Sequence, residues 1–239
     1  MSELFSIQLQ NRQQQGGDGV WLDLPTTTEQ VQAALRQIGI SSDNPQGLFI
    51  SGYFAEEEKR FAIPYNMVLA SNVDALNFLA AQLETLSAGE RAELNAALQA
   101  PQSELFSIGR ITDFPENVDY YVHLPDVRGP AQLGDYYLNR SGMVDMPDEW
   151  KGGINTAQFG RFVAQQEQGA FTQYGYLVKS GDAWQKVHEG QPVPEEYRVL
   201  SFPVPEILRD AANIPPPVQP ETEPQKVIPI ILNLSLIHI

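Results

Sequence analysis

Hydrophobic and polar residues alternate in three short stretches near the start of the chain. In residues 4–9 apolar side chains fall on every second position from Phe5 onward, as in a half-buried strand. Residues 20–24 (VWLDL) and 47–53 (GLFISGY) carry the β-branched and aromatic residues typical of strands. We therefore predict three strands, the first two joined by the polar, Gln- and Gly-rich turn of residues 10–19.

A helix with one apolar face is predicted between the second and third strands. Glu29 follows Thr26 at the spacing of a capping box, in which two side chains accept each other's backbone N–H groups. Gly39 can adopt the left-handed conformation that ends a helix. The apolar positions recur at i, i+3, i+4 and i+7, at Val31, Ala34, Leu35 and Ile38.

Residues 71–100 have the most regular helical periodicity in the chain. Ser71 or Asn72 is placed to cap a first helix, and Ser87 with Glu90 forms a capping box for a second. The apolar face comprises Val73, Leu76, Leu79, Ala80, Leu83, Leu94, Ala97 and Leu98. We predict a helical hairpin between two parts that contain sheets.

The hexapeptide SELFSI occurs twice, at residues 2–7 and at residues 103–108. Six identities in order are consistent with a duplicated strand or with chance in a β-favouring sequence. The flanking residues do not match and no third copy follows, so the chain is not a repeat array.

A second group of strand and helix signals follows. Residues 118–124 (VDYYVHL) alternate as a strand, and residues 132–140 predict a short helix closed by Gly142. Aromatic and β-branched residues predict a further strand over residues 171–178.

A longer helix is predicted before that last strand. Asn155 or Thr156 can cap its first turn, and Gly169 can end it. Its mainly apolar face comprises Phe159, Phe162, Val163 and Gln166.

Two more strands are predicted near the end of the folded region. Gly181 marks a turn, residues 183–187 a partner strand, and residues 197–202 (YRVLSF) another strand.

Together these elements predict an elongated α+β fold in four parts. Residues 1–65 form a small N-terminal α+β domain, residues 66–101 a helical middle segment, and residues 102–202 a second α+β domain. Residues 203–239 contain eight prolines between positions 203 and 229, which is typical of a linker or disordered tail. We interpret the apolar last 13 residues, VIPIILNLSLIHI, as a truncated or artefactual end.

The charge of the chain is its unusual property. Thirty acidic residues against 15 basic residues give a net charge of −15, and the excess is spread along the chain. Such a charge favours solubility and cationic partners, and it argues against direct nucleic-acid binding, which needs a Lys/Arg surface.

No residue pattern indicates a catalytic, metal or cofactor site. Cysteine is absent, and His123, His188 and His238 have no partner at ligand spacing. The chain has no phosphate-binding loop, no Gly-x-Ser-x-Gly motif and no His-Glu-x-x-His motif. We therefore predict no enzyme activity and no cofactor. The sequence also has no signal-peptide pattern and no apolar run long enough to span a membrane, so we expect a cytoplasmic protein.

Three segments resemble the ArdA family of antirestriction proteins. They are VWLDLPTTTEQVQAALRQIGI (residues 20–40), SNVDALNFLAAQLETL (residues 71–86) and the combination LGDYYL…G…P with FGRFVA…GAFTQYGYL (residues 133–177). The similarity covers roughly residues 4–190. The chain departs from the usual family form by a longer segment between Pro101 and Leu133 and by its proline-rich extension.

The resemblance implies a DNA mimic that occupies the DNA-binding groove of type I restriction–modification enzymes, usually as a homodimer. Carboxylates on a stiff surface would then stand in for phosphates, and the aromatic residues beneath them would supply rigid support. The expected phosphate surrogates are Glu56, Glu57, Glu58, Asp113, Glu116, Asp119, Asp126, Asp135, Asp145, Asp148 and Glu149.

Two other function classes stay open. One is a non-enzymatic interaction module of a mobile-element protein, whose acidic surface binds another basic partner. The other is a carboxylate-dependent hydrolase, because glycoside hydrolysis needs only two carboxyl groups at a fixed separation. The second is the weaker hypothesis, since a chain with 30 carboxylates offers many plausible pairs.

Overall fold

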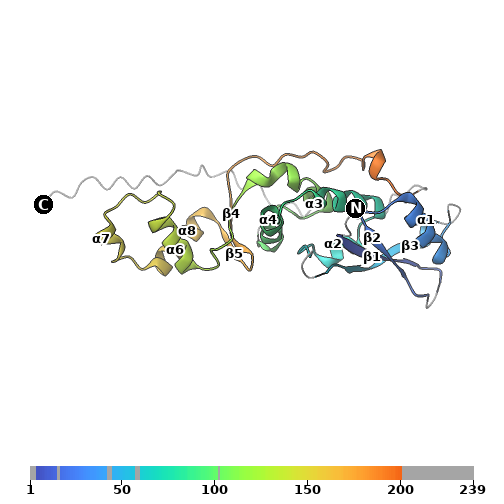
Figure 1. Ribbon diagram of the computed structural model, residues 1–239, viewed down its shortest axis with the longest axis horizontal. Helices are drawn as coiled ribbons and strands as arrows, with labels where there is room; N and C mark the ends of the chain where they lie inside the picture. Colours follow the sequence, from blue (N-terminus) through green and yellow to red (C-terminus); the bar gives the residue numbers. More distant parts are fainter. Residues whose placement is uncertain (1–3, 15–16, 42–44, 57–59, 102, 201–239) are drawn as a thin grey trace, which may run out of the picture.

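The computed structural model describes residues 4–14, 17–41, 45–56, 60–101 and 103–200. The described chain is elongated (Figure 1), with a first sheet and its helix at one end, helices in the middle, and a second sheet with three further helices at the other end. This arrangement confirms the predicted α+β fold class.

The first sheet contains the three predicted strands, β1 (Phe5–Asn11), β2 (Val20–Leu24) and β3 (Leu48–Phe54). All pairs are antiparallel and the order is β2-β1-β3. Buried and partly exposed residues alternate along β1, so Ile7 and Leu9 lie in the core, while Trp21 on β2 lies half-exposed on the opposite face. A short 3-10 helix, η1 (Pro45–Gly47), leads into β3.

Helix α1 (Thr28–Gln37) forms as predicted, but its capping box uses different residues. Thr27 caps the helix and Gln30 is its partner, whereas the prediction named Thr26 and Glu29. Thr26 is buried and its backbone N–H donates to Asn77 at 2.7 Å, so this residue holds α1 to the middle helices instead. Gly39 follows the helix with φ of 67°, as the prediction required.

The middle of the chain contains α2 (Tyr65–Leu69), α3 (Val73–Glu84) and α4 (Ala88–Gln99). Asn72 caps α3 by accepting from the N–H of Ala75, and Ser87 and Glu90 form the predicted capping box of α4. Helix α2 was not predicted, because its five residues are too few to show a periodic pattern.

The second SELFSI copy does not form a strand, so the duplicated-strand hypothesis is wrong. Residues 103–106 are irregular, and Ser107 caps α5 (Ile108–Thr112) by accepting from the N–H of Arg110. Phe106 is exposed, whereas the equivalent Phe5 is buried in the first sheet. The 3-10 helix η3 (Phe114–Tyr120) follows and occupies the first residues of the strand predicted over 118–124.

The second sheet has the order β4-β6-β5 and consists of β4 (Tyr121–Leu124), β5 (Ala170–Thr172) and β6 (Gly175–Lys179). The single strand predicted over residues 171–178 is therefore a hairpin. Its turn ends at Gly175, whose φ of 130° disfavours any other residue, and the hydroxyl of Thr172 accepts from the N–H of Tyr174.

Beyond the second sheet lie α6 (Pro130–Asn139), α7 (Asp148–Lys151) and α8 (Thr156–Glu167), with Asn155 as the cap of α8. The predicted apolar face of α8 is correct only in part. Val163 packs against the smaller core, but Phe162 is 51% exposed, Gln166 is exposed, and the buried residues are Gly160 and Ala164. Small residues face α6 because the two backbones nearly touch there.

Helix α8 also ends differently from the prediction. Gln168, rather than Gly169, has the left-handed conformation, with φ of 55°. A Cβ on Gly169 would lie 1.9 Å from the hydroxyl oxygen of Tyr176, so this glycine makes room for the tyrosine on β6.

Residues 180–200, here called the return segment, run back from β6 towards the first sheet (Figure 1). The strands predicted over 183–187 and 197–202 are absent from the described part of this segment, which contains only the 3-10 helix η4 (Glu195–Tyr197). Side chains of α3 and η3, rather than neighbouring strands, pair with its backbone.

One hydrophobic core extends from the first sheet through α3, α4 and α5 to Tyr121 on β4 and Leu177 on β6. A smaller core, formed by Val127, Leu133, Ala164 and Tyr176, lies beneath α6 and α8. The domain boundaries at residues 65 and 101 stay a prediction, and the proline-rich residues 203–239 lie outside the described residues. No helix in the described ranges is long and apolar enough to cross a bilayer.

Candidate functional site

The carboxylates predicted to bind a partner lie between the first sheet and the far end of the molecule. Asp113 is buried, and Glu57 and Glu58 lie outside the described residues. The others are Glu56 after β3, Glu116 and Asp119 on η3, Asp126 after β4, Asp135 on α6, Asp145 before α7, and Asp148 and Glu149 in the first turn of α7.

Five of these residues form what we call the exposed acidic set. Each is solvent-exposed and makes no ion pair with another described residue. An exposed carboxylate without a cationic neighbour keeps its full negative field towards solvent. The set comprises Glu116, Asp119, Asp126, Asp145 and Glu149.

Two predicted residues are instead paired with basic side chains. Asp135 lies 3.2 Å from Arg140, and Asp148 lies 2.7 Å from Lys151. The hydrogen bond and charge of Lys151 lower the pKa of the Asp148 carboxyl. Both pairs are on the surface, where such contacts are weak and screened by salt, so a more strongly charged partner can displace them.

Asp113 was predicted as a surface carboxylate, and the structure corrects this. Its exposed fraction is 0%, and its two carboxylate oxygens accept from the backbone N–H groups of His188 and Glu189 at 2.5 and 3.2 Å. Burial raises the pKa of Asp113, while these two hydrogen bonds oppose the rise. Asp113 therefore holds the return segment and is not exposed to solvent.

Sequence reasoning missed an acidic residue on α4 that lies close to the exposed acidic set. Glu93 is only partly exposed, and its Oε1 atom is buried without a hydrogen-bond partner. Burial raises its pKa to about 8, and the negative charges of Glu90 and Asp119 add to the rise. Carboxylates of α4 and η3 therefore interact electrostatically. Helical spacing alone could have placed Glu93 beside Glu90, but not beside Asp119.

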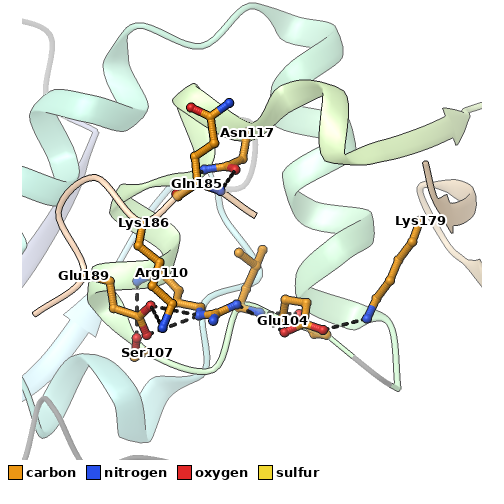
Figure 2. Close-up of polar contacts among 10 residues, drawn as sticks. Glu104, Ser107, Arg110, Asn117, Lys179, Gln185, Lys186 and Glu189 are labelled. Carbon is orange, nitrogen blue, oxygen red and sulfur yellow. Dashed lines mark hydrogen bonds and ion pairs between the residues drawn. The ribbon is translucent and has the colours of Figure 1, made fainter. Parts of the chain in front are cut away.

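Several basic side chains are neutralised within the chain around Arg110 (Figure 2). The Arg110 guanidinium lies 3.1 Å from Glu104 and 3.2 Å from Glu189. Lys179 pairs with Glu104 at 2.6 Å, and Lys186 with Glu189 at 3.4 Å. Three basic side chains are thus paired with the two carboxylates of this network. The excess of negative charge lies elsewhere on the surface.

Arg110 is itself buried in this network. Its guanidinium lies 4.7 Å from the ring centroid of Phe106 and 5.6 Å from that of Trp184. Contacts of this kind stabilise a desolvated cation. Arg110 therefore has a structural role.

Tyrosines support the far end of the molecule around one carboxylate. Tyr137 on α6 and Tyr176 on β6 both donate their hydroxyls to Glu167 on α8, the latter at 3.1 Å. Burial and the nearby Glu167 charge raise the pKa of both tyrosines. This arrangement connects α6, α8 and β6.

The histidines in the described region are used in the same structural way. The ring of His123 is 2.9 Å from the carbonyl oxygen of Tyr174, and the ring of His188 lies edge-on against Phe78. Within the described ranges, no group of three or more His, Cys, Asp or Glu residues is arranged to hold a metal ion.

Comparison with protein families adds to this description. Residues 17–178 match the family model described as "Antirestriction protein (ArdA)", which covers more than half of the chain. A search of curated protein sequences gave no match. The return segment lies beyond the matched residues. The chain belongs to the ArdA family of antirestriction proteins.

Proposed function

We propose that this protein acts as an acidic DNA mimic that occupies the DNA-binding groove of type I restriction–modification enzymes. The observation that carries the proposal is the exposed acidic set, five carboxylates without ion-pair partners among the described residues. They lie on η3, after β4 and around α7, and so extend from the middle of the elongated molecule to one end (Figure 1).

The physical basis is that a DNA-binding groove is lined with Lys and Arg to neutralise phosphates. Duplex DNA presents one negative charge about every 3.4 Å along each strand. A surface that carries many carboxylates attracts the same groove and accelerates the encounter by electrostatic steering. The spacing of the carboxylates along the surface is part of the proposal.

A mimic also has to hold its charges in place, because a flexible acidic chain loses entropy when it binds. The Glu167–Tyr137–Tyr176 contacts hold α6, α8 and β6 together at the end of the molecule that carries α7. We further propose that the protein binds its target as a homodimer in the cytoplasm, where incoming DNA meets restriction enzymes.

The proposal is tested with a purified type I restriction–modification enzyme and its DNA substrate. The test protein replaces four members of the exposed acidic set: Glu116→Gln, Asp119→Asn, Asp126→Asn and Asp145→Asn. We expect the concentration needed for half-inhibition of DNA cleavage to rise by at least about tenfold, because each lost charge weakens a many-point electrostatic contact.

A control variant carries the same change in net charge at other exposed positions. It replaces Asp18→Asn, Asp182→Asn, Glu195→Gln and Glu196→Gln. Equal loss of inhibition in both variants would mean that total charge, and not the exposed acidic set, determines binding.

Competition separates mimicry from binding at another basic surface. A mimic is displaced from the enzyme by duplex DNA, and its affinity falls steeply as salt concentration rises. If the protein and the DNA bind the enzyme simultaneously, the alternative of a general acidic interaction module is favoured.

A further inference from the structure

We propose that the return segment, residues 180–200, is a brace that fixes the lobe formed by the second sheet and α6–α8 in one orientation relative to the first sheet and α3. The segment lies beyond residues 17–178, which match the ArdA family model. This inference concerns the scaffold, and its test does not depend on the proposed partner.

The first half of the brace is held by η3 and by the residue just before it. Asn117 pairs with Gln185 in both directions: its Oδ1 accepts from the Gln185 N–H at 2.7 Å, and its Nδ2 donates to the Gln185 carbonyl at 2.9 Å (Figure 2). Asp113 accepts from the N–H groups of His188 and Glu189. A side-chain amide and a carboxylate thus take the place of a neighbouring strand.

The second half of the brace is held by α3. The Oδ1 atom of Asp74 accepts from the N–H groups of Val199 and Leu200 at 2.8 and 2.9 Å. Asn77 donates to the carbonyl of Tyr197 at 3.0 Å. The backbone is therefore fixed again about ten residues after the first attachment, close to the N-terminal turn of α3.

Burial makes these attachments costly to release. Asp113, Asn77 and Asn117 are only 0%, 3% and 4% exposed, and each would lose a hydrogen-bond partner if the segment detached. Side-chain packing adds to this: the ring of Phe78 lies 4.7 Å from that of Tyr197, and Val199 is buried in the main core.

An ion-pair chain closes the brace at the second sheet. Glu189 in the return segment pairs with Arg110 on α5, Arg110 pairs with Glu104, and Glu104 pairs with Lys179 at the end of β6 (Figure 2). Both ends of residues 180–189 are therefore held, through Lys179 and Glu189, to Glu104 and Arg110 in the connection before the second sheet.

A second connection has a mechanical consequence. The chain first reaches the lobe from the first sheet and α3 through α5 and η3. The return segment then passes back alongside these two elements. The main core reaches the second sheet at Tyr121 and Leu177, whereas α6 and α8 pack on the separate smaller core, so rotation of the lobe would act on this limited contact. A second attached connection opposes that rotation.

Distances between spin labels test this inference directly, because the chain has no natural cysteine. Gln37→Cys at the end of α1 and Gln165→Cys on α8 place labels at exposed positions in the two halves. The full-length protein is labelled, mixed with an excess of unlabelled protein to suppress signals between copies, and measured by double electron–electron resonance.

Two ways of releasing the brace are compared. In the first, Glu189→Ala and Tyr197→Ala remove the Arg110 ion pair and the Phe78 contact from the segment's own side. In the second, a protease recognition sequence inserted between Gly190 and Gln191, both exposed, allows the segment to be cut after folding. The control variant carries Gln191→Ala and Glu196→Ala, which replace exposed side chains of the same segment.

The expected result is a narrow distance distribution in the parent and control proteins, and a distribution at least about twice as wide after either form of release. Circular dichroism confirms that the compared proteins are folded, and the cleaved protein supplies the answer if the substituted one does not fold. The proposal is overturned if release leaves the parental width unchanged, whatever the protein does to restriction enzymes.

Discussion

The backbones of Gly160 on α8 and Pro130 on α6 approach so closely that a Cβ atom on Gly160 would lie 1.8 Å from the carbonyl oxygen of Pro130. Gly134 on α6 meets α8 in the same way, with its Cβ position 2.0 Å from the carbonyl oxygen of Thr156. Two glycines, one on each helix, therefore set the distance between α6 and α8. The helices cannot accept even a methyl group there without moving apart.

The first prediction is that Gly160→Ala destabilises the protein, although alanine normally favours a helix. Overpacking of a close contact costs about 1–3 kcal/mol, more than alanine's helix preference of about 1 kcal/mol offsets. Thermal and urea unfolding measure the change. The control is Gly89→Ala in the first turn of α4, where the nearest atom is 4.0 Å away, and where stability is expected to stay equal or rise. An unchanged or higher unfolding midpoint for Gly160→Ala would contradict the described helix contact.

The second prediction concerns pH. The pKa of Glu93 is raised to about 8 in the folded protein, whereas a carboxyl of this type in the unfolded chain titrates near its ordinary value of 4.5. Between these values the folded state holds a proton that the unfolded state has lost. Stability therefore falls as pH rises from about 4.5 to about 8, and the effect is complete above that range.

Glu93→Gln removes this dependence because glutamine resembles the protonated acid. The variant should match the parent at pH 4 and be more stable by about 2 kcal/mol at pH 9, a figure reduced from the full shift because the side chain is partly exposed. Urea unfolding at both pH values measures the difference. A matched control is Glu116→Gln on the neighbouring η3, which is exposed and should change stability little at either pH. Parallel stability profiles for Glu93→Gln and the parent protein would contradict the prediction.

The third prediction concerns Asn77, which joins three parts of the fold. Its Oδ1 accepts from the N–H of Thr26 before α1, and its Nδ2 donates to the carbonyl of Tyr197 in the return segment. Asn77→Ala leaves both backbone groups without this partner and should cost about 2–4 kcal/mol. Asn77→Asp keeps the acceptor for Thr26 but turns a buried carboxylate oxygen towards the Tyr197 carbonyl, so it should cost at least as much. Chemical unfolding measures both losses, and a loss below about 1 kcal/mol in Asn77→Ala would contradict the described contacts.

The fourth prediction is that no single member of the exposed acidic set is essential for inhibition. On the proposed function the contact is spread over many charges, so replacing Asp126 or Glu149 alone should change the half-inhibitory concentration less than about threefold. Titration of each single variant in the restriction assay measures this. Complete loss from one neutral replacement would instead indicate a catalytic or otherwise unique carboxylate, as the hydrolase hypothesis requires.

Much of the fold could be predicted because its signals are local. Strand β2 was predicted at its observed bounds from five residues, and the capping box of Ser87 and Glu90 depends only on groups three residues apart. The ArdA resemblance likewise rests on continuous segments, and the family match confirms it. These features depend on neighbouring residues and not on the tertiary structure.

The candidate site was less predictable, because exposure is a property of the whole fold. Asp113 and Glu116 are three residues apart in the same acidic stretch, yet the first is buried under the return segment and the second faces solvent. The pKa of Glu93 depends on Asp119, a residue on another helix. No window of sequence contains both partners of either contact.

The return segment shows most clearly what only the tertiary structure decided. Strands were predicted over residues 183–187 and 197–202, but Asp74, Asp113 and Asn117 bind the backbone groups of this segment from positions about 70 to 125 residues away. The amino-acid sequence by itself determined the family, the fold class and the negative charge of this protein. Which carboxylates face solvent and which hold the chain together was decided by long-range packing, because burial and pairing depend on residues that meet only in the folded molecule.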